Sequence, residues 1–263
     1  MDGTVFDSVA ELYDRVRPTY PDGIFDDVAE LGRLQRGARI VEVGPATGQA
    51  TRALARRGWS VTAIEPGANL AATATERLAD FPDVAIELSR FENWHPPADA
   101  AYDAVFAATS WHWVDPARGY AKAARLLRPD GVLAVVTTHH VLPVGGDRFF
   151  VEIQDVYDDI EESDSRGGPP EPDAVADPLG AEIADSGWFD PPEIRRHVWS
   201  RTYTADEYID VLRTYSGHIV MTDEQRSRLF GAIRERIGGR TPPTVEKHYL
   251  NIVYVARRRR ADR

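Results

Sequence analysis

The chain of 263 residues contains no cysteine, and its 42 Asp and Glu outnumber its 31 Lys and Arg, which gives a formal net charge of −11. This length fits one large domain or two small ones, and a hydrophobic content of 43% is enough to bury a core without disulfides or a structural metal. The lack of cysteine excludes iron–sulfur clusters, cysteine-ligated zinc and thiol nucleophiles. The acidic balance argues against a nucleic-acid partner, because surfaces that bind nucleic acid neutralise phosphates with Lys and Arg.

The sequence also lacks the patterns of export and membrane insertion. The N-terminal residues show no basic segment followed by an apolar one. The most apolar stretch, residues 131–144, is interrupted by polar residues such as Thr137 and His139 and by Pro143. We therefore expect a cytoplasmic protein without a membrane partner.

In chain order, the expected elements begin with an ordered leader over residues 11–21 and a helix around residues 24–31. Between residues 39 and 138, short β-branched runs alternate with helical spacing of apolar residues, which is typical of a parallel sheet with crossover helices. A turn at residues 129–131 precedes the last of these runs. The pattern predicts an α/β protein with a doubly wound sheet. Its expected strands are residues 39–43, 59–65, 84–88, 102–108 and 132–138.

The remainder of the chain is less regular. Residues 149–162 are helix-like, and residues 163–177 are rich in Pro, Gly and acids, which predicts a flexible loop. Residues 151–177 carry a net charge of −9, so most of the excess charge of the protein lies in this insertion. Two further strands are expected at residues 195–203 and 249–256, which makes seven. Two apolar stripes between them predict helices: Tyr208, Val211, Leu212 and Tyr215, then Leu229, Ile233 and Ile237.

The segment IVEVGPATG, residues 40–48, is the most informative motif because it follows a strand and opens a helix. Glycines at such a turn let a ligand approach the backbone, and the start of the helix offers free N–H groups. A dinucleotide fingerprint requires G-x-G-x-x-G, whereas Gly44 and Gly48 here flank Pro-Ala-Thr and the third glycine is missing. Glu42, two residues before Gly44, suits a cationic or zwitterionic ligand better than a pyrophosphate.

Glu65 ends the second expected strand, 17 residues after Gly48. A carboxylate there can accept hydrogen bonds from both ribose hydroxyls of an adenosine that lies across the strand ends. The loop and the acid together indicate an adenosine-containing cofactor. They leave an NAD(P)-dependent oxidoreductase as an alternative, which the glycine spacing disfavours.

Five successive segments, EVGPATGQAT, AIEPGANLAA, FENW, YDAVFAATSWHWVDP and LLRPDGVLAVV, resemble in order the motifs of class I S-adenosylmethionine-dependent methyltransferases. The resemblance covers roughly residues 6–138, and it is closest to small-molecule enzymes of the trans-aconitate methyltransferase-like group. It implies a Rossmann-like fold, here a seven-stranded sheet that is mostly parallel with an antiparallel last strand and helical lid insertions. It also implies S-adenosyl-L-methionine as cofactor and S-adenosyl-L-homocysteine as product.

The resemblance further assigns a cofactor site. Gly44 and Gly48 would lie against the methionine part of the cofactor, Glu65 would hold the ribose, and Phe91 and Glu92 would border the adenine. The cofactor-binding residues that we expect are Tyr13, Arg17, Tyr20, Glu42, Gly44, Ala46, Gly48, Glu65, Phe91, Glu92, Thr109 and Trp111.

Two features of this site stand apart. Tyr13, Arg17 and Tyr20 resemble an N-terminal lid that closes over the cofactor, and Arg17 could pair with a carboxylate of cofactor or substrate, or lie on the surface beside Pro18. Ala46 occupies the position of the family's middle glycine, so its methyl group is expected to crowd the loop and affect affinity.

Methyl transfer from a sulfonium requires a lone pair in line with the methyl group, so such an enzyme works mainly by positioning and by excluding water. A carboxylate acceptor needs no base, whereas a phenol, amine or carbon acid can need one. His112, after the fourth strand, is the candidate base, or it only hydrogen-bonds between its two Trp neighbours. His139 and His140 are adjacent on a strand, so at most one should face the site. The expected substrate-lining residues are Trp113, His139, Tyr208 and Tyr215, the last two of which also fit plain core packing.

We expect one methyltransferase domain over residues 1–263, acting on a small-molecule substrate as a monomer or homodimer, without a metal. Its parts would be an N-terminal lid and helix (1–38), a cofactor-binding core (39–138), an acidic insertion (139–177) and C-terminal strands (178–263) with a helical lid over 204–240. The insertion and the lid would build the substrate chamber. A non-catalytic module that binds the same cofactor is the remaining alternative.

Overall fold

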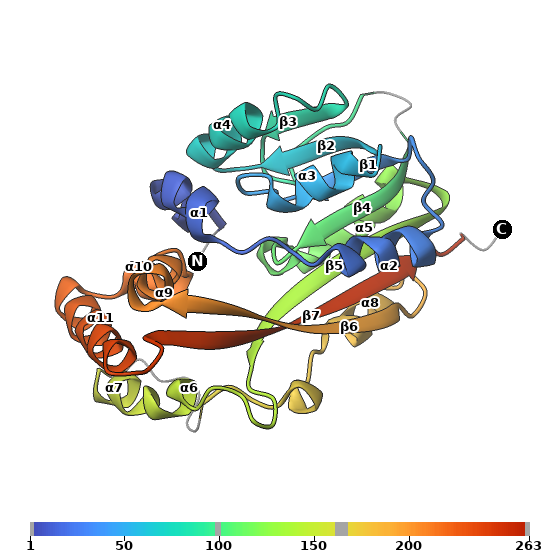
Figure 1. Ribbon diagram of the computed structural model, residues 1–263. Coiled ribbons are helices and arrows are strands. Elements are labelled where there is room, and N and C mark those ends of the chain that lie inside the picture. Colours follow the sequence, from blue (N-terminus) through green and yellow to red (C-terminus); the bar gives the residue numbers. More distant parts are fainter. Residues whose placement is uncertain (1–2, 98–100, 161–167, 261–263) are drawn as a thin grey trace.

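A seven-stranded sheet forms the centre of the protein, in the order β3-β2-β1-β4-β5-β7-β6. The computed structural model describes residues 3–97, 101–160 and 168–260 (Figure 1). The strands are β1 (Arg39–Val43), β2 (Ser60–Glu65), β3 (Val84–Leu88), β4 (Tyr102–Ala108), β5 (Leu127–Val141), β6 (Glu193–Thr204) and β7 (Thr244–Arg257). Strands β1 to β5 pair in parallel, and β7 pairs antiparallel with β5 and β6. The expected Rossmann-like sheet with an antiparallel last strand is confirmed.

Helices cover both faces of this sheet, which explains why its strands are short apolar runs. Helices α2 (Asp22–Gly32) and α3 (Gln49–Arg56) pack on one face, and α5 (Pro116–Leu126) and α8 (Leu179–Asp185) pack on the other. Successive strand residues point to opposite faces. Ile40 and Phe106 therefore join the α2 side of the core, whereas Val41 and Val105 join the α5 side.

Beyond the central sheet, β6 and β7 extend into a helical lobe, at the lower left in Figure 1. The lobe contains α6 (Phe149–Glu152), α7 (Gln154–Asp159), α9 (Ala205–Leu212), α10 (Ser216–Val220) and α11 (Asp223–Gly238). It has its own apolar core, which includes Phe150, Tyr208 and Ile233. Helices α9 and α11 begin at capping boxes in which Thr204 and Thr222 cap the first turn.

The N-terminal leader joins the two parts of the molecule. After a 3-10 turn, η1 (Gly3–Val9), helix α1 (Ala10–Val16) contacts both α4 (Ala68–Arg77) and α9 (Figure 1). Asp14 pairs with Arg77 on α4 at 2.9 Å, and the Nε of Arg17 donates to the Oγ1 of Thr214 at 2.8 Å. The expected ordered leader is confirmed, and its contacts place α1 between the sheet and the lobe.

The structure corrects two expected elements. Residues 129–131 do not precede β5 but belong to it, as an irregular stretch in which the pairing register with β4 shifts. Tyr215 lies outside α9, which ends at Leu212, so the apolar stripe that was expected to form one helix spans a helix and a turn. In the second place, the apolar pattern continues beyond the end of the helix.

The prediction of a flexible loop over residues 163–177 is also wrong in part. Residues 163–167 lie outside the described residues, but residues 168–177 contain a 3-10 turn and are fastened to the sheet. Leu142 donates its backbone N–H to the carbonyl of Pro170 at 2.8 Å, and Arg196 donates to the carbonyl of Pro172 at 2.6 Å. Asp177 hydrogen-bonds to Thr137 at 2.8 Å. Hydrogen bonds to β5, to Leu142 directly after it and to β6 thus hold the segment in place, although its Pro- and Gly-rich composition favours flexibility.

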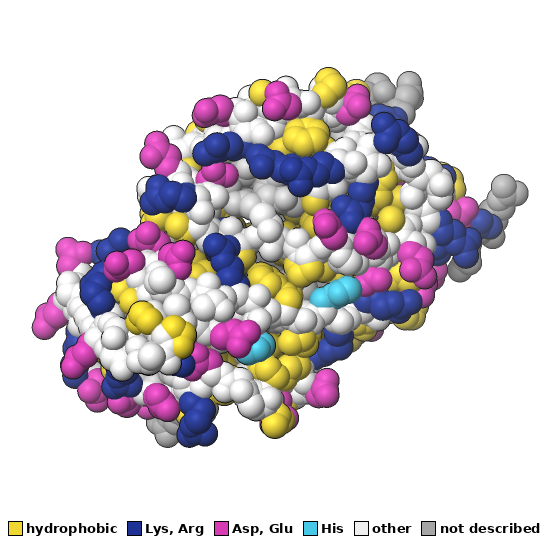
Figure 2. Space-filling view, viewed as in Figure 1, with side chains coloured by type: hydrophobic (Ala, Val, Ile, Leu, Met, Phe, Trp, Pro, Cys, Tyr) yellow, Lys and Arg dark blue, Asp and Glu magenta, His cyan; other side chains and the backbone are white. Residues whose placement is uncertain are grey.

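Acidic and basic side chains alternate over the visible face of the lobe (Figure 2). Asp155 and Asp159 of the acidic insertion pair with Arg236 and Arg228 of α11 at 2.7 and 2.8 Å. Part of the negative charge of the insertion is therefore compensated within the lobe. None of the helices in the described ranges is long and apolar enough to cross a membrane.

Candidate active site

The loop after β1 turns sharply because three of its residues adopt the left-handed conformation. Gly44, Ala46 and Gly48 have φ of 66°, 52° and 92°. A Cβ on Gly44 would lie 2.7 Å from the Cβ of Ser110, and one on Gly48 would lie 2.8 Å from Leu78. The two glycines are thus required by packing as well as by backbone geometry. Ala46 tolerates its positive φ at a cost of about 1 kcal/mol.

Glu65 fixes this loop from the end of β2. Its Oε2 accepts a hydrogen bond from the backbone N–H of Ala46 at 3.0 Å, and its Oε1 accepts one from Gly67 at 2.9 Å. Burial raises the pKa of Glu65 to about 7, although these two hydrogen bonds oppose the shift. Each oxygen keeps a second lone pair, so the carboxyl group can still accept hydrogen bonds from a ligand.

A narrow cleft, with a cavity of about 90 Å³, lies between this loop, Glu65 and the start of the chain. It brings together seven of the expected cofactor-binding residues, together with Trp113, which was expected to line the substrate site. The seven are Tyr13, Gly44, Ala46, Glu65, Phe91, Glu92 and Thr109.

Glu42 and Gly48 do not line the cleft. Glu42 is 1% exposed beneath the loop, its Oε2 has no hydrogen-bond partner in the described structure, and burial raises its pKa to about 8. Gly48 instead packs against Leu78. Glu42 is thus buried within β1, and Gly48 belongs to the loop but not to the wall of the cleft.

Thr109, directly after β4, lies where the cleft meets two further cavities. It is a non-glycine residue with a φ of 56°. Its hydroxyl is 3.1 Å from that of Tyr20 and 2.9 Å from that of Thr138. Side-chain hydrogen bonds from two elements therefore hold a strained backbone at this junction, and such strain is typical of ligand sites.

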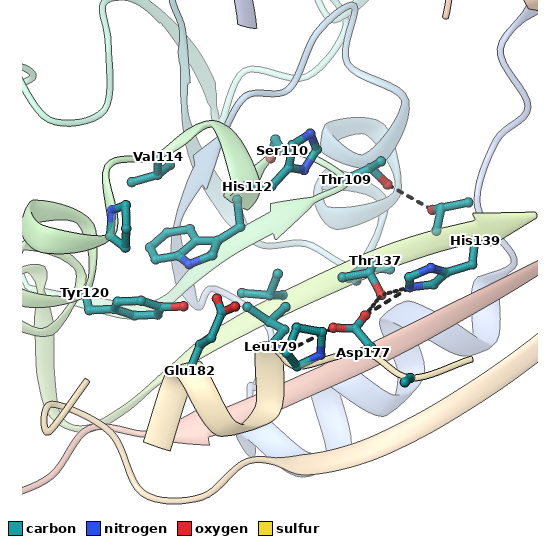
Figure 3. Close-up of a pocket in the computed structure, with 17 residues that line it drawn as sticks. Thr109, Ser110, His112, Val114, Tyr120, Thr137, His139, Asp177, Leu179 and Glu182 are labelled. Carbon is teal, nitrogen blue, oxygen red and sulfur yellow. Dashed lines mark hydrogen bonds and ion pairs between the residues drawn. The ribbon is translucent and has the colours of Figure 1, made fainter. Parts of the chain in front are cut away.

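The first cavity measures about 490 Å³ and lies between β4, β5 and α8 (Figure 3). Trp111 lines it, and we call it the Trp111 cavity. Asp177 is 2.9 Å from the Nε2 of His139 and 2.8 Å from the Oγ1 of Thr137. Burial opposes ionisation of Asp177, but these hydrogen bonds prevail and lower its pKa to about 2. Asp177 is thus an ionised acceptor that fixes His139.

His112 lies on the rim of the same cavity and takes no part in this hydrogen-bonded group (Figure 3). Its ring is stacked obliquely on Trp113, with centroids 4.6 Å apart. Partial desolvation lowers its pKa below the usual value, so the imidazole is neutral at pH 7 and can accept a proton.

The second cavity, which we call the Lys247 cavity, measures about 230 Å³ and lies between α1, β5, β7 and the lobe. It contains Arg17, Tyr20 and Tyr215, all expected site residues, and His140 in place of His139. The two histidines follow strand alternation, so each faces a different cavity. Tyr208 is 4% exposed in the lobe core and lines none of the three cavities.

Comparison with known proteins agrees with this architecture. Residues 41–135 match the model of the methyltransferase domain family. The chain is 28% identical over 252 residues, covering 95% of its length, to an uncharacterized methyltransferase of Mycobacterium tuberculosis, of which it covers 92%. These matches support assignment of the chain to the class I S-adenosylmethionine-dependent methyltransferases.

Solved structures show the same fold at low sequence identity. A protein of Anaeromyxobacter dehalogenans, provisionally described as a type II methyltransferase, has a TM-score of 0.64 and 22% identity, covering 92% of this chain and 97% of its own. Phosphoethanolamine N-methyltransferase 2 of Haemonchus contortus, in complex with S-adenosylhomocysteine, has a TM-score of 0.51 and 13% identity, covering 95% of this chain and 57% of its own. The narrower trans-aconitate-like resemblance stays a prediction.

The residues that line the cleft suit the chemistry of S-adenosylmethionine. The loop leaves its backbone open where a Cβ on Gly44 would clash, and Glu65 presents oxygens with free lone pairs. The aromatic rings of Phe91 and Trp113 offer apolar surface for a flat base. The cleft therefore provides hydrogen-bond acceptors and apolar walls, as an adenosine-containing sulfonium requires.

Sequence reasoning missed Lys247 of the methyltransferase, together with Tyr249 and Trp199. Lys247 is 2% exposed and lies on the buried face of β7 with Val245 and Tyr249. The expected strand began at residue 249, so strand alternation could not be used to predict on which face of the sheet Lys247 lies. A strand extended to Thr244 would have placed a lysine among core positions, which is the signal that could have revealed it.

Proposed function

We propose that the enzyme transfers the methyl group of S-adenosylmethionine to a small-molecule acceptor by direct in-line displacement. The observation that carries the proposal is the junction at Thr109, where the cleft of Glu65 opens toward two cavities of small-molecule size. When bound, the cofactor supplies an electrophilic methyl group on a sulfonium. The protein contributes position and a dry environment.

The roles of the site residues follow from their placement. Glu65 would accept hydrogen bonds from the ribose hydroxyls, and Phe91 and Glu92 would border the adenine. Tyr13 lines both the cleft and the Lys247 cavity, so it would separate cofactor from acceptor. Arg17, which lines the Lys247 cavity, would neutralise a carboxylate there. Helix α1, which carries Tyr13 and precedes Arg17, would act as the lid.

His112 lines the Trp111 cavity, so it would serve as base only for an acceptor that reaches this cavity and must lose a proton. A screen with isotopically labelled cofactor against phenols, amines and carboxylic acids identifies the class of acceptor. If a phenol or amine is methylated, His112→Gln is expected to lower kcat/KM by about 100-fold, with binding of S-adenosylhomocysteine unchanged. Unchanged kcat/KM with such an acceptor would remove His112 from the mechanism.

The displacement itself is testable with a cofactor whose methyl group is made chiral by isotopes. A single in-line step inverts the configuration of that group, and we expect inversion in the product. Retention would contradict direct transfer. Saturable binding of the cofactor without turnover of any acceptor class would favour a non-catalytic binding module.

A further inference from the structure

The Lys247 cavity has an unusual balance of charge. Its lining includes the cationic side chains of Arg17 and Lys247, and no Asp or Glu among the described residues lines it. The side-chain nitrogens Nε2 of His140 and Nε2 of Gln49 are buried there without a hydrogen-bond partner in the described part of the chain. Cations and unused polar nitrogens thus converge on one enclosed space.

Lys247 is the central residue of this cavity because it is buried and the described residues give it no counter-ion. Its Nζ donates a hydrogen bond to the hydroxyl of Tyr215 at 3.3 Å. It lies 5.5, 5.0 and 5.3 Å from the ring centroids of Tyr208, Tyr215 and Tyr249. Within the described ranges, no carboxylate pairs with it. Aromatic rings contribute about 1–2 kcal/mol to such a cation, which does not replace a buried negative charge.

The positive charges of Lys247 and Arg17 shift the pKa values of neighbouring side chains. Burial alone would raise the pKa of Tyr215, but the charges of Lys247 and Arg17 outweigh it and lower that pKa. Burial first, and then Lys247, holds the pKa of His140 well below its usual value, so its ring is neutral. The guanidinium of Arg17 lies 4.4 Å from the Tyr215 ring. One ring therefore lies next to both cations.

We propose that the Lys247 cavity binds the methyl acceptor through a carboxylate group that pairs with Lys247. This proposal rests on the proposed function, which places an acceptor beside Thr109. The aromatic side chains of Tyr20, Trp199 and Tyr249 wall the rest of the cavity, so a small, flat carboxylate is its best-fitting occupant. Arg17 lines the same cavity and provides a second cation there.

A network of hydrogen bonds links this carboxylate site to the junction. Trp199 donates to the Oδ1 of Asn251 at 2.6 Å, and Asn251 donates to the Oγ1 of Thr138 at 2.7 Å. Thr138 in turn is 2.9 Å from Thr109. These hydrogen bonds hold Trp199, in the wall of the Lys247 cavity, in a defined position relative to Thr109. A ligand bound at Lys247 is therefore positioned relative to the methyl-transfer junction.

The test compares benzoate with benzamide, which differ in charge but hardly in shape. Calorimetric titration is made on the full chain saturated with S-adenosylhomocysteine. We expect the wild type to bind benzoate at least tenfold more tightly than benzamide. Absence of saturable benzoate binding, or equal affinity for the two, would overturn the proposal.

Lys247→Met is expected to abolish this preference, and Lys247→Gln, which keeps a hydrogen-bond donor without the charge, is expected to do the same. Arg213→Met removes an exposed cation of the same lobe and should leave the preference unchanged. A preference that survives in both Lys247 variants would mean that the lysine has only a packing role.

Binding of S-adenosylhomocysteine is measured first in every variant. It reports that the variant is folded, and it separates the two proposals. Failure of the wild type to bind S-adenosylhomocysteine would contradict the proposed function, whereas normal binding with no discrimination of benzoate would contradict the carboxylate site alone.

Discussion

At the scale of single residues, the loop after β1 shows how neighbours decide what a position tolerates. Gly44 and Gly37 both have positive φ, but only at Gly44 would an added Cβ meet a neighbouring side chain, that of Ser110. Ala46 shows that a methyl group alone is accepted where there is room. Glycine is therefore essential in this loop at Gly44 for two separate reasons.

This difference predicts the outcome of a matched pair of substitutions. Gly37→Ala should cost about 1 kcal/mol through backbone conformation. Gly44→Ala should cost about 2–3 kcal/mol, because overpacking against Ser110 adds to it, and it should also weaken binding of S-adenosylhomocysteine. Denaturant unfolding and calorimetry measure both quantities. Equal losses in the two variants would mean that contact with Ser110 is unimportant.

Glu42 and Glu65 make stability depend on pH. Burial raises their pKa values to about 8 and about 7, so the folded state binds more protons than the unfolded state between about pH 4.5 and pH 8. Stability must fall as pH rises through this window.

Glu42→Gln should therefore stabilise the free protein at pH 8, by on the order of 2 kcal/mol, and change it little at pH 5. Thermal or urea unfolding at the two pH values measures the difference. A stabilisation of the same size at both pH values would show that Glu42 does not titrate in this way.

At the scale of elements, Asp177 is the acid that helps to hold the segment before α8. Asp177 accepts hydrogen bonds from Thr137, from the backbone N–H of Leu179 at 3.0 Å and from His139. The low pKa of Asp177, about 2, means that this stabilisation is present above about pH 4 and is lost as pH falls through 2.

Asp177→Asn should lower stability by about 1–2 kcal/mol at pH 7, and the difference from the wild type should shrink toward pH 2. The matched control is Asp173→Asn, an exposed acid in the same segment, which should change stability by less than about 0.5 kcal/mol. A loss that is the same at pH 7 and pH 3 would contradict the assigned role of the carboxylate.

The sequence predicted the elements of the sheet well and the lobe less well, for physical reasons. Buried parallel strands are continuous apolar runs between helices, so residues 39–138 could be predicted from local pattern. Asp177 and Lys247 depend on partners distant in the chain. Asp177 shows no local signal, and the signal of Lys247 emerges only when the last strand is extended to Thr244. The cofactor cleft follows from loops at strand ends, whereas the two cavities depend on how β7 and the lobe pack.

At the scale of the whole molecule, helix α1 joins the sheet and the lobe across the cleft, and the cleft and both cavities meet at Thr109. Asp14 fastens α1 to α4, and Arg17 fastens it to Thr214. Removal of one contact should loosen the lid without unfolding the sheet.

Arg17→Met is accordingly expected to weaken binding of S-adenosylhomocysteine about tenfold, while the melting temperature falls by only a few degrees. Arg15→Met, on the same helix, provides the control for loss of charge. Calorimetry and thermal unfolding give the two quantities. An unchanged affinity would remove Arg17 from the site.

The central claim is that the cleft between the glycine loop and Glu65 binds S-adenosylmethionine. Titration of the wild type and of Glu65→Gln with S-adenosylhomocysteine and with NAD⁺ tests it most directly. We predict one saturable site for S-adenosylhomocysteine, at least tenfold weaker binding in Glu65→Gln, and no binding of NAD⁺. Binding of NAD⁺ without S-adenosylhomocysteine, or equal affinity in the two proteins, would contradict this claim.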